Sequence, residues 1–370
     1  MVDTLRWVPR HRFLAAMLIA GAAAFASSCG SNATGHVATI AHFKQINAVA
    51  ASGDQVWVAN QYGGYKQNGS VTELNAATGS VLRVIGSKSD RFVDPVAIAV
   101  AGDAVWVLSQ YGGPMYENNA TGVVTELSAA TGRTLRIISS PSGALSAPDG
   151  ICVVGTDIWV ANQIGSGYNL NGSVIELSAS TGKVVEVFGS AADMINSPVG
   201  VVADAGKIWI ADGGLVGPAV TVLDARSGKL LRVVYTVSSS SNSQAAGIWA
   251  SGRNVWVTYN ADSTHAPVAE LSAATERVIR SFDAAQHGLS DPTSIAVSRH
   301  AVWVTEQFGG LGEFNLASGA FIRGNSVVGS GPGLATQSIA VWGSHVWAPG
   351  SGESLVEIDA STGNVIRTII

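Results

Sequence analysis

Short apolar runs, each bounded by polar turn residues, recur along most of the chain. Seven of them place a tryptophan between aliphatic residues directly after a tight polar turn, as in Val56-Trp57-Val58. Successive tryptophans of this set are 44 to 53 residues apart, which is close to the period of about 40 to 50 residues in propeller repeats. The pattern therefore predicts seven copies of one β-rich unit. The seven tryptophans are Trp57, Trp106, Trp159, Trp209, Trp256, Trp303 and Trp347.

Each copy contains four strand-like runs. The first is rich in Gly, Ala and Ser, which suits strands crowded around an axis, and the second carries the tryptophan. A run that is apolar at every position must be covered on both faces, and neighbouring blades would supply that cover. The predicted fold is all-β, a seven-bladed β-propeller of four-stranded antiparallel blades over residues 46–370. Either Val365–Ile369 or His36–Phe43 is expected to complete the closing blade.

The third and fourth runs predict a hairpin whose turn pairs a short polar residue with a glycine, as at Thr131-Gly132. Glycine takes the positive φ of such a turn at little cost. Glu276 stands at the glycine position of the fifth copy, and a different turn is expected there.

Glutamate and arginine residues ten apart lie symmetrically about this turn in five copies. They are expected to face one another as cross-strand ion pairs with a structural role, each contributing about 0.2 to 1 kcal/mol. The third copy instead places Glu176 opposite Glu186, and the fourth places Val222 opposite Arg232. The five pairs are Glu73 and Arg83, Glu126 and Arg136, Glu270 and Arg280, Glu313 and Arg323, and Glu357 and Arg367.

The composition and net charge of the chain argue against one class of partner, nucleic acids. Of the 370 residues 13% are charged, and the formal net charge is −5. Phosphate neutralisation requires a basic stripe, which this composition does not offer, so nucleic acid is not an expected partner. The high apolar content gives no sign of disorder.

The first 28 residues read as an export signal, because arginines precede a short apolar segment, Phe13 to Phe25. Ala24-Phe25-Ala26 fits ordinary signal cleavage, while Ser27-Ser28-Cys29-Gly30 resembles the lipobox of bacterial lipoproteins. Lipidation at Cys29 is favoured and would be the protein's membrane attachment, with residues 29–45 as a tail or linker. The expected location is the bacterial cell envelope, outside the cytoplasm. Cys152, in an apolar run, is expected to be a buried and unreactive thiol.

Loop lengths differ between the two faces of the predicted propeller. The turns between first and second runs and between third and fourth runs are short, so the long loops share the other face, where binding is expected. Amide and aromatic side chains in these Gly-containing loops suit a glycan or a peptide. Their regular recurrence is explained more simply by a role in satisfying the loop backbone. The candidate ligand-binding residues are Gln61, Tyr62, Tyr65, Gln110, Tyr111, Tyr116, Gln163, Tyr168, Tyr259, Gln307 and Phe308.

Catalytic candidates are few. His265 and His287 fall in long loops, and Glu306 ends a tryptophan-bearing run. Together they suggest a metal site or an acid–base pair, but their spacing follows no metal-ligand pattern, and solvated loop residues are the simpler interpretation. The metal ligands remain unassigned.

The repeat resembles the bacterial superfamily of YVTN-repeat and NHL-repeat propellers that includes the streptogramin lyases. The resemblance rests on the strand Val56-Trp57-Val58-Ala59-Asn60 and the hairpin Ser128-Ala129-Ala130-Thr131-Gly132-Arg133, and it covers residues 46–370. It implies a seven-bladed propeller. Streptogramin lyases use magnesium, a histidine base at the start of an innermost strand and a glutamate that Glu306 resembles. The segments entering the innermost strands of this chain, such as Asp94-Pro95-Val96, carry no such histidine.

Two functions follow from these observations. The favoured one is an exported propeller, lipid-anchored at Cys29, that binds an extracytoplasmic protein, peptide or glycan through its long-loop face without a cofactor. The alternative is a magnesium-dependent lyase or hydrolase of the streptogramin-lyase type, with His265, His287 and Glu306 as catalytic residues. A structural protein of the envelope is a third possibility.

Overall fold

The computed structural model describes residues 42–112, 121–139, 144–164, 172–189, 193–213, 217–236, 244–260, 267–289, 291–306, 310–325, 338–350 and 353–370. Within these ranges no helix has the length and apolar character needed to cross a membrane. The expected export signal and six of the candidate residues lie outside them. These six are Cys29, Tyr116, Tyr168, His265, Gln307 and Phe308.

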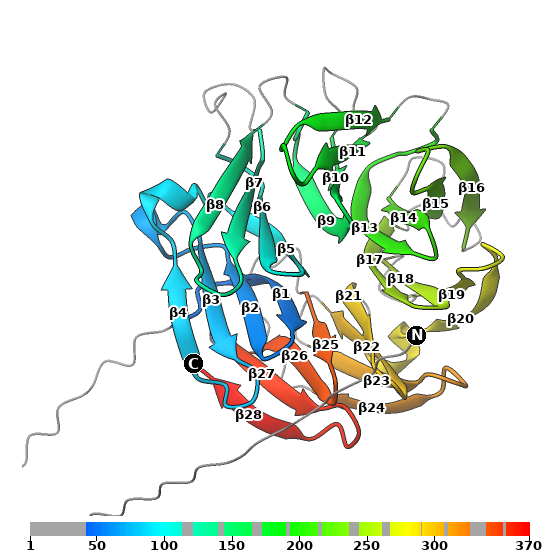
Figure 1. Ribbon diagram of the computed structural model, residues 1–370. Coiled ribbons are helices and arrows are strands. Elements are labelled where there is room, and N and C mark those ends of the chain that lie inside the picture. The colour runs from blue at the N-terminus through cyan, green and yellow to red at the C-terminus, as the bar shows by residue number, and fades with distance from the viewer. Residues whose placement is uncertain are drawn as a thin grey trace, which may run out of the picture. The chain divides into compact units, whose positions relative to one another are not determined.

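The described residues form seven four-stranded antiparallel sheets arranged as blades in a ring, which confirms the predicted seven-bladed β-propeller (Figure 1). The innermost strands are β1 (Ile46–Ser52), β5 (Pro95–Ala101), β9 (Pro148–Val154), β13 (Pro198–Asp204), β17 (Gln244–Ser251), β21 (Pro292–Val297) and β25 (Ala340–Trp342). The second strands are β2 (Gln55–Asn60), β6 (Ala104–Ser109), β10 (Asp157–Asn162), β14 (Lys207–Asp212), β18 (Asn254–Asn260), β22 (Ala301–Glu306) and β26 (His345–Gly350).

The outer half of each blade is the predicted hairpin. The third strands are β3 (Ser70–Asn75), β7 (Val123–Ser128), β11 (Ser173–Ser178), β15 (Ala219–Asp224), β19 (Pro267–Ser272), β23 (Leu311–Asn315) and β27 (Ser354–Asp359). The outer strands are β4 (Val81–Ile85), β8 (Thr134–Ser139), β12 (Val184–Phe188), β16 (Leu230–Tyr235), β20 (Val278–Asp283), β24 (Phe321–Asn325) and β28 (Val365–Ile369). Short 3-10 turns occur at η1 (Tyr65–Gln67), η2 (Lys88–Asp90) and η3 (Ala285–His287).

Within the described residues, the ring closes without exchange of a strand between the first and last blades. The last blade takes all four strands, β25 to β28, from the C-terminal segment, so the Val365–Ile369 alternative for the closing blade is confirmed. The backbone N–H of Ser338, which precedes β25, donates to the carbonyl of Asn47 in β1 at 3.4 Å. Closure therefore depends on contacts between the first and last blades.

The core lies between the blades. Each repeat tryptophan is at most 3% exposed and packs with aliphatic residues of an adjoining blade. Trp57, for example, packs with Val105 and Leu127 of the second blade. This arrangement explains why the second strands are apolar at every position, because both faces of each blade are covered.

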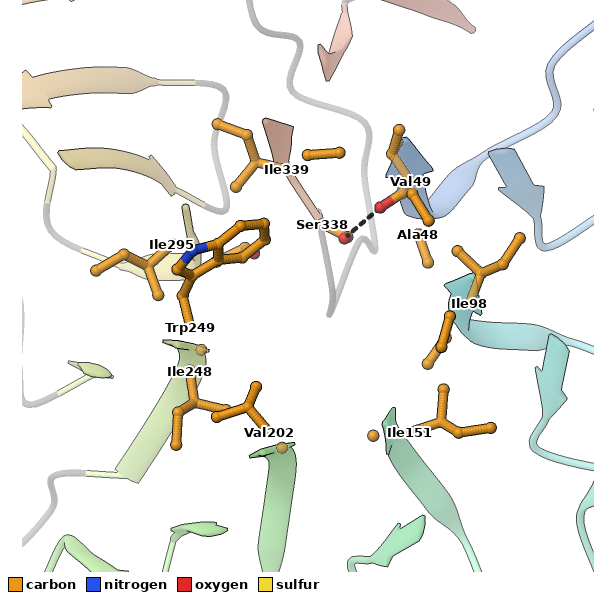
Figure 2. A pocket seen from close by; sticks show the side chains of 18 of the residues that line it. Ala48, Val49, Ile98, Ile151, Val202, Ile248, Trp249, Ile295, Ser338 and Ile339 are labelled. Carbon is orange, nitrogen blue, oxygen red and sulfur yellow. Dashed lines mark hydrogen bonds between the residues drawn. The ribbon is translucent and has the colours of Figure 1, made fainter. Parts of the chain in front are cut away.

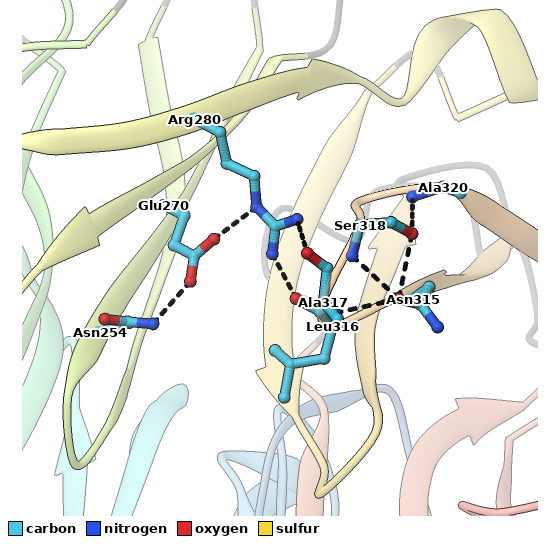
Figure 3. Close-up of polar contacts among 8 residues, drawn as sticks. All are labelled: Asn254, Glu270, Arg280, Asn315, Leu316, Ala317, Ser318 and Ala320. Carbon is cyan, nitrogen blue, oxygen red and sulfur yellow. Dashed lines mark hydrogen bonds and ion pairs between the residues drawn. The ribbon is translucent and has the colours of Figure 1, made fainter.

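The five predicted Glu–Arg pairs are register partners on the third and outer strands, with nitrogen–oxygen distances of 2.5 to 2.8 Å. Their glutamates are buried. Four of the arginines also donate to a carbonyl in the hairpin turn of the next blade. Figure 3 shows Arg280 between Glu270 of its own blade and the carbonyls of Leu316 and Ala317. Each such arginine therefore joins two blades as well as two strands.

Glu276 occupies the same turn as the glycines of the other hairpins, so the expectation of a different turn is wrong. Its φ is 55°, against 67° for Gly132, and both backbone N–H groups donate to the first residue of their turn. The fourth blade explains the exchange. Val222 cannot pair with Arg232, and the Glu276 carboxylate takes its place, bound by Arg232 at 3.2 Å and by Lys207 at 2.9 Å.

Two substitutions of Glu276 isolate the free-energy cost of its left-handed backbone, because both remove the carboxylate and differ only at the backbone and Cβ. Glu276→Ala keeps a side chain in the left-handed region and loses both ion pairs, whereas Glu276→Gly loses the pairs but relieves the backbone. We expect the alanine variant to have the lower free energy of unfolding, by about 1 kcal/mol, in urea denaturation. Equal stability of the two variants would contradict the left-handed assignment.

Candidate functional site

The long loops of the first two blades are tied together by their backbones. The N–H of Tyr65 donates to the carbonyl of Gly86 at 2.6 Å, and the N–H of Asp94 donates to that of Asn68 at 2.7 Å. η2 begins with a capping box in which the backbone N–H of Ser87 donates to the Asp90 carboxylate at 2.6 Å. These bonds hold the loop backbone from which the side chains of this surface project.

Two tyrosines are exposed on this surface. Tyr62 is 47% exposed and Tyr65 is 43% exposed, and the ammonium group of Lys66 lies 5.6 Å from the centre of the Tyr65 ring. Lys44 reaches the same loop, where its Nζ lies 3.5 Å from the side-chain oxygen of Gln67. Exposed aromatic rings beside cations are typical of sites that recognise other molecules.

A pocket of about 160 Å³ opens between η1 and η2. Its lining includes Tyr65, Lys88 and Arg91 together with the backbone of Gly86 and Gly112. The Arg91 guanidinium donates to the carbonyl of Gly112 at 2.8 Å, which leaves further N–H groups for a ligand. Lys44, Lys66, Lys88 and Arg91, with Tyr62 and Tyr65, are called the basic patch below.

The two nearby carboxylates are turned to internal partners. Asp90 is buried and accepts hydrogen bonds from the Ser87 backbone and the Thr134 hydroxyl. Asp94 accepts a bond from the Asn47 side chain at 3.2 Å, and burial raises its pKa despite that bond and one from Gln61. Among the described residues no ion pair neutralises the cations of the basic patch. The surface is therefore locally positive on a protein of negative net charge.

The predicted glutamines have a shared structural role through their backbones. The N–H groups of Gln61, Gln110 and Gln163 donate to the carbonyls of Gln45, Asp94 and Ala147, which precede the innermost strands. Tyr111 follows the same pattern, since its N–H donates to the Val93 carbonyl at 3.2 Å. The recurring Gln and Tyr positions are thus explained in part by the scaffold.

Tyr259 differs from its expected place in an exposed loop. It lies inside β18 and its side chain is fully buried in the core between the fourth and fifth blades. Burial raises the pKa of its hydroxyl, and the nearby Asp212 charge adds to the rise. Because the Tyr259 side chain is not exposed among the described residues, a ligand bound at their surface does not contact its ring.

The structure does not bring His287 and Glu306 to one centre. The His287 ring stacks on Phe321 of the outer strand β24, with ring centres 4.2 Å apart. Glu306 ends β22, is 7% exposed, and is the register partner of Pro292 in the innermost strand β21. In the described part of the chain no cluster of three or more His, Cys, Asp or Glu residues is arranged to hold a metal ion.

Two other acidic residues lie at strand ends. Asp149 is the second residue of the innermost strand β9, and burial raises its pKa to about 6. Asp212 ends β14 with 2% exposure, and burial raises its pKa to about 7 against hydrogen bonds from Thr221 and the Asn196 backbone. Sequence reasoning had no reason to select either, because both are single acidic residues beside apolar runs.

No protein-family model and no curated protein matches this chain. Among solved structures, the chain is similar to hydrazine synthase of Kuenenia stuttgartiensis, with a TM-score of 0.63, 16% identity, and coverage of 92% of this chain and 99% of that one. It is also similar to the WD40 repeats of RRP9, with a TM-score of 0.61, 12% identity, and coverage of 83% and 88%.

A computationally designed protein, Ika8, is similar as well, with a TM-score of 0.59, 15% identity, and coverage of 89% of this chain and 88% of that one. At these identities the likeness shows the β-propeller fold alone. The closer resemblance to YVTN-repeat, NHL-repeat and streptogramin-lyase propellers stays a prediction.

Proposed function

We propose that this propeller is a binding platform whose basic patch recognises an acidic segment of a partner protein or peptide. The observation that carries the proposal is the pocket between η1 and η2, where Tyr65, Lys88 and Arg91 converge. The β-propeller commonly serves as a protein-binding scaffold. We further propose that the protein is exported and lipid-anchored at Cys29, which places the partner in the cell envelope.

A protein or peptide partner is favoured over a glycan by the chemistry of the patch. Tyrosine and arginine are enriched at protein interfaces and among the residues that dominate binding energy. Unpaired cations attract carboxylates and speed the encounter with an acidic partner. The fixed loops lower the entropy lost on binding, because the surface is already ordered. No specific observation favours the lyase alternative.

The test measures binding of a fluorescein-labelled Glu-rich peptide by fluorescence anisotropy. We expect the double variant Lys66→Glu/Lys88→Glu to weaken binding by about tenfold or more, because both exposed side chains reverse in charge. Lys88 lines the pocket, and Lys66 lies beside the ring of Tyr65, which also lines it. We expect Tyr65→Ala to weaken it as well. Binding by the parent protein should also weaken as salt is added.

The matched control is the double variant Arg133→Glu/Arg253→Glu, which makes the same charge change at exposed turns of the opposite face. It should leave binding near the parental value. Equal weakening by both double variants would overturn the proposal, because net charge alone would then account for binding. Preference for a sulfated oligosaccharide over the peptide would point to a glycan instead.

A further inference from the structure

The seven innermost strands enclose a channel with a volume of about 340 Å³. This volume lies at the lower end of the range for small-molecule pockets. Figure 2 shows aliphatic side chains of several blades around the open centre, among them Ile98, Ile151 and Ile248, with the Trp249 ring beside them. The channel is a cavity separate from the basic patch.

Strand register shows that the apolar wall is systematic. In each innermost strand, the residue just before the partner of the blade's tryptophan is Val or Ile. All seven line the channel and form one aliphatic ring around the axis. The ring consists of Val49, Ile98, Ile151, Val201, Ile248, Ile295 and Ile339.

The polar lining residues lie where the innermost strands begin, at the long-loop mouth. Three of them are satisfied inside the protein. The Asn47 amide donates to the Pro95 carbonyl at 3.0 Å, the Thr293 hydroxyl lies 3.1 Å from that of Thr305, and the Ser338 hydroxyl donates to the Val49 carbonyl at 3.4 Å. Their hydrogen-bonding groups are engaged within the protein and offer little to a ligand.

Asp149 is the exception at this mouth. It is the single charged residue among those that line the channel. In the described part of the chain no hydrogen bond or ion pair reaches its carboxylate, and burial is the sole cause of its raised pKa. Asp149 is partly exposed at the mouth, so a ligand can reach its carboxylate, and the apolar wall beside it disfavours the charge unless a cation binds there.

We propose that the channel binds a slender aliphatic amine, with its ammonium group at Asp149 and its alkyl tail along the aliphatic ring. The positions of the lining residues along the channel determine this orientation, because the carboxylate lies at the mouth and the Val and Ile residues lie deeper. A lysine side chain entering from a docked protein would carry its charge past Asp149 into the apolar part. The geometry therefore selects a free amphiphilic cation rather than an inserted side chain.

The test is isothermal titration calorimetry with octylamine at pH 8, where both charges are present. We expect saturable binding, with octanoate and octan-1-ol bound at least about tenfold more weakly, because a charge-assisted hydrogen bond is lost. Asp149→Asn should weaken octylamine binding by a similar factor. Asp103→Asn, which removes an exposed carboxylate from a turn on the opposite face, should have no effect.

A second variant checks the position of the tail. Ala99→Phe adds a ring to a residue that lines the channel and leaves Asp149 in place, so octylamine binding should be lost while the thermal unfolding midpoint reports whether the blades remain folded. Unchanged octylamine binding in either Asp149→Asn or folded Ala99→Phe would overturn the proposal. Equal affinity for octan-1-ol and octylamine would also overturn the proposal, because the ammonium group would then contribute nothing and the channel would be an apolar cavity without specificity for cations.

Discussion

Arg367→Ala is expected to lower the free energy of unfolding by about 2 to 3 kcal/mol. Arg367 lies 2.5 Å from the Glu357 carboxylate, which is fully buried, and its removal leaves that carboxylate with the His345 ring, whose Nδ1 lies 2.6 Å away. Removing one member of a buried ion pair costs more than the pair itself contributes, because the other charge stays buried. Denaturation in guanidinium chloride measures the change.

Ring closure gives Arg367 a second role. Its guanidinium donates to the carbonyl of Ala77 at 2.9 Å, which joins the last blade to the first. Interior blades are also joined by the chain, whereas this junction has no connecting segment. Native-state hydrogen exchange should therefore speed up in β28 and around Ala77 in the variant.

Arg136→Ala is the matched control for the closure argument. Arg136 makes the same cross-strand pair with Glu126 at 2.6 Å, but its blade is connected by the chain on both sides. We expect a smaller loss of stability and no faster exchange at the junction between the first and last blades. Equal effects of the two substitutions would show that Arg367 acts within its blade alone.

The fold followed from the sequence because its signals repeat. Seven tryptophan-bearing runs and five Glu–Arg pairs all predict the same four-stranded unit, so an ambiguous signal in one copy is resolved by the other copies. The turn at Glu276 could not be predicted in this way. Its left-handed backbone is supported by Lys207 and Arg232, which belong to the preceding blade, and one hairpin read alone does not contain them.

The candidate site was less predictable for a related reason. Loop residues were ranked by residue type, but Tyr259 belongs to the end of a strand and is buried, while Tyr62 and Tyr65 are exposed. Burial depends on packing between blades, which the sequence does not give directly. Lys88 and Arg91 could have been noticed as cations close together in one long loop. Their convergence with Tyr65 requires the backbone bonds between two loops.

Asp212→Asn is expected to stabilise the protein at pH 8 by about 2 to 4 kcal/mol. Burial raises the pKa of Asp212 from 3.8 to about 7, so ionising it in the folded state costs free energy that the unfolded state does not incur. Each pKa unit corresponds to about 1.4 kcal/mol. Asparagine removes the charge and with it the cost of ionisation. The expected gain in the free energy of unfolding is smaller than the pKa shift implies, because the asparagine NH2 group has no ready hydrogen-bond partner.

The pH dependence gives the sign of the effect. Between about pH 4 and pH 7 folded Asp212 holds a proton that the unfolded chain releases, so its contribution to stability falls as pH rises and is fully lost above about pH 7. The variant should therefore be slightly less stable than the parent near pH 4, where the amide group without a partner is the main difference, and more stable than the parent at pH 8. Urea denaturation at several pH values measures the difference, in which the other titrating groups cancel.

Asp224→Asn, in the same blade, is the control with the opposite sign. Hydrogen bonds from Ser227 and Arg226 lower the pKa of Asp224, so its carboxylate stabilises the fold above its unfolded pKa, and that contribution is lost as pH falls. Asp224→Asn should therefore lower stability at pH 8 and not near pH 2. If Asp212→Asn also lowered stability at pH 8, the carboxylate would have to be held by a cation, and burial would not be the dominant influence on its charge.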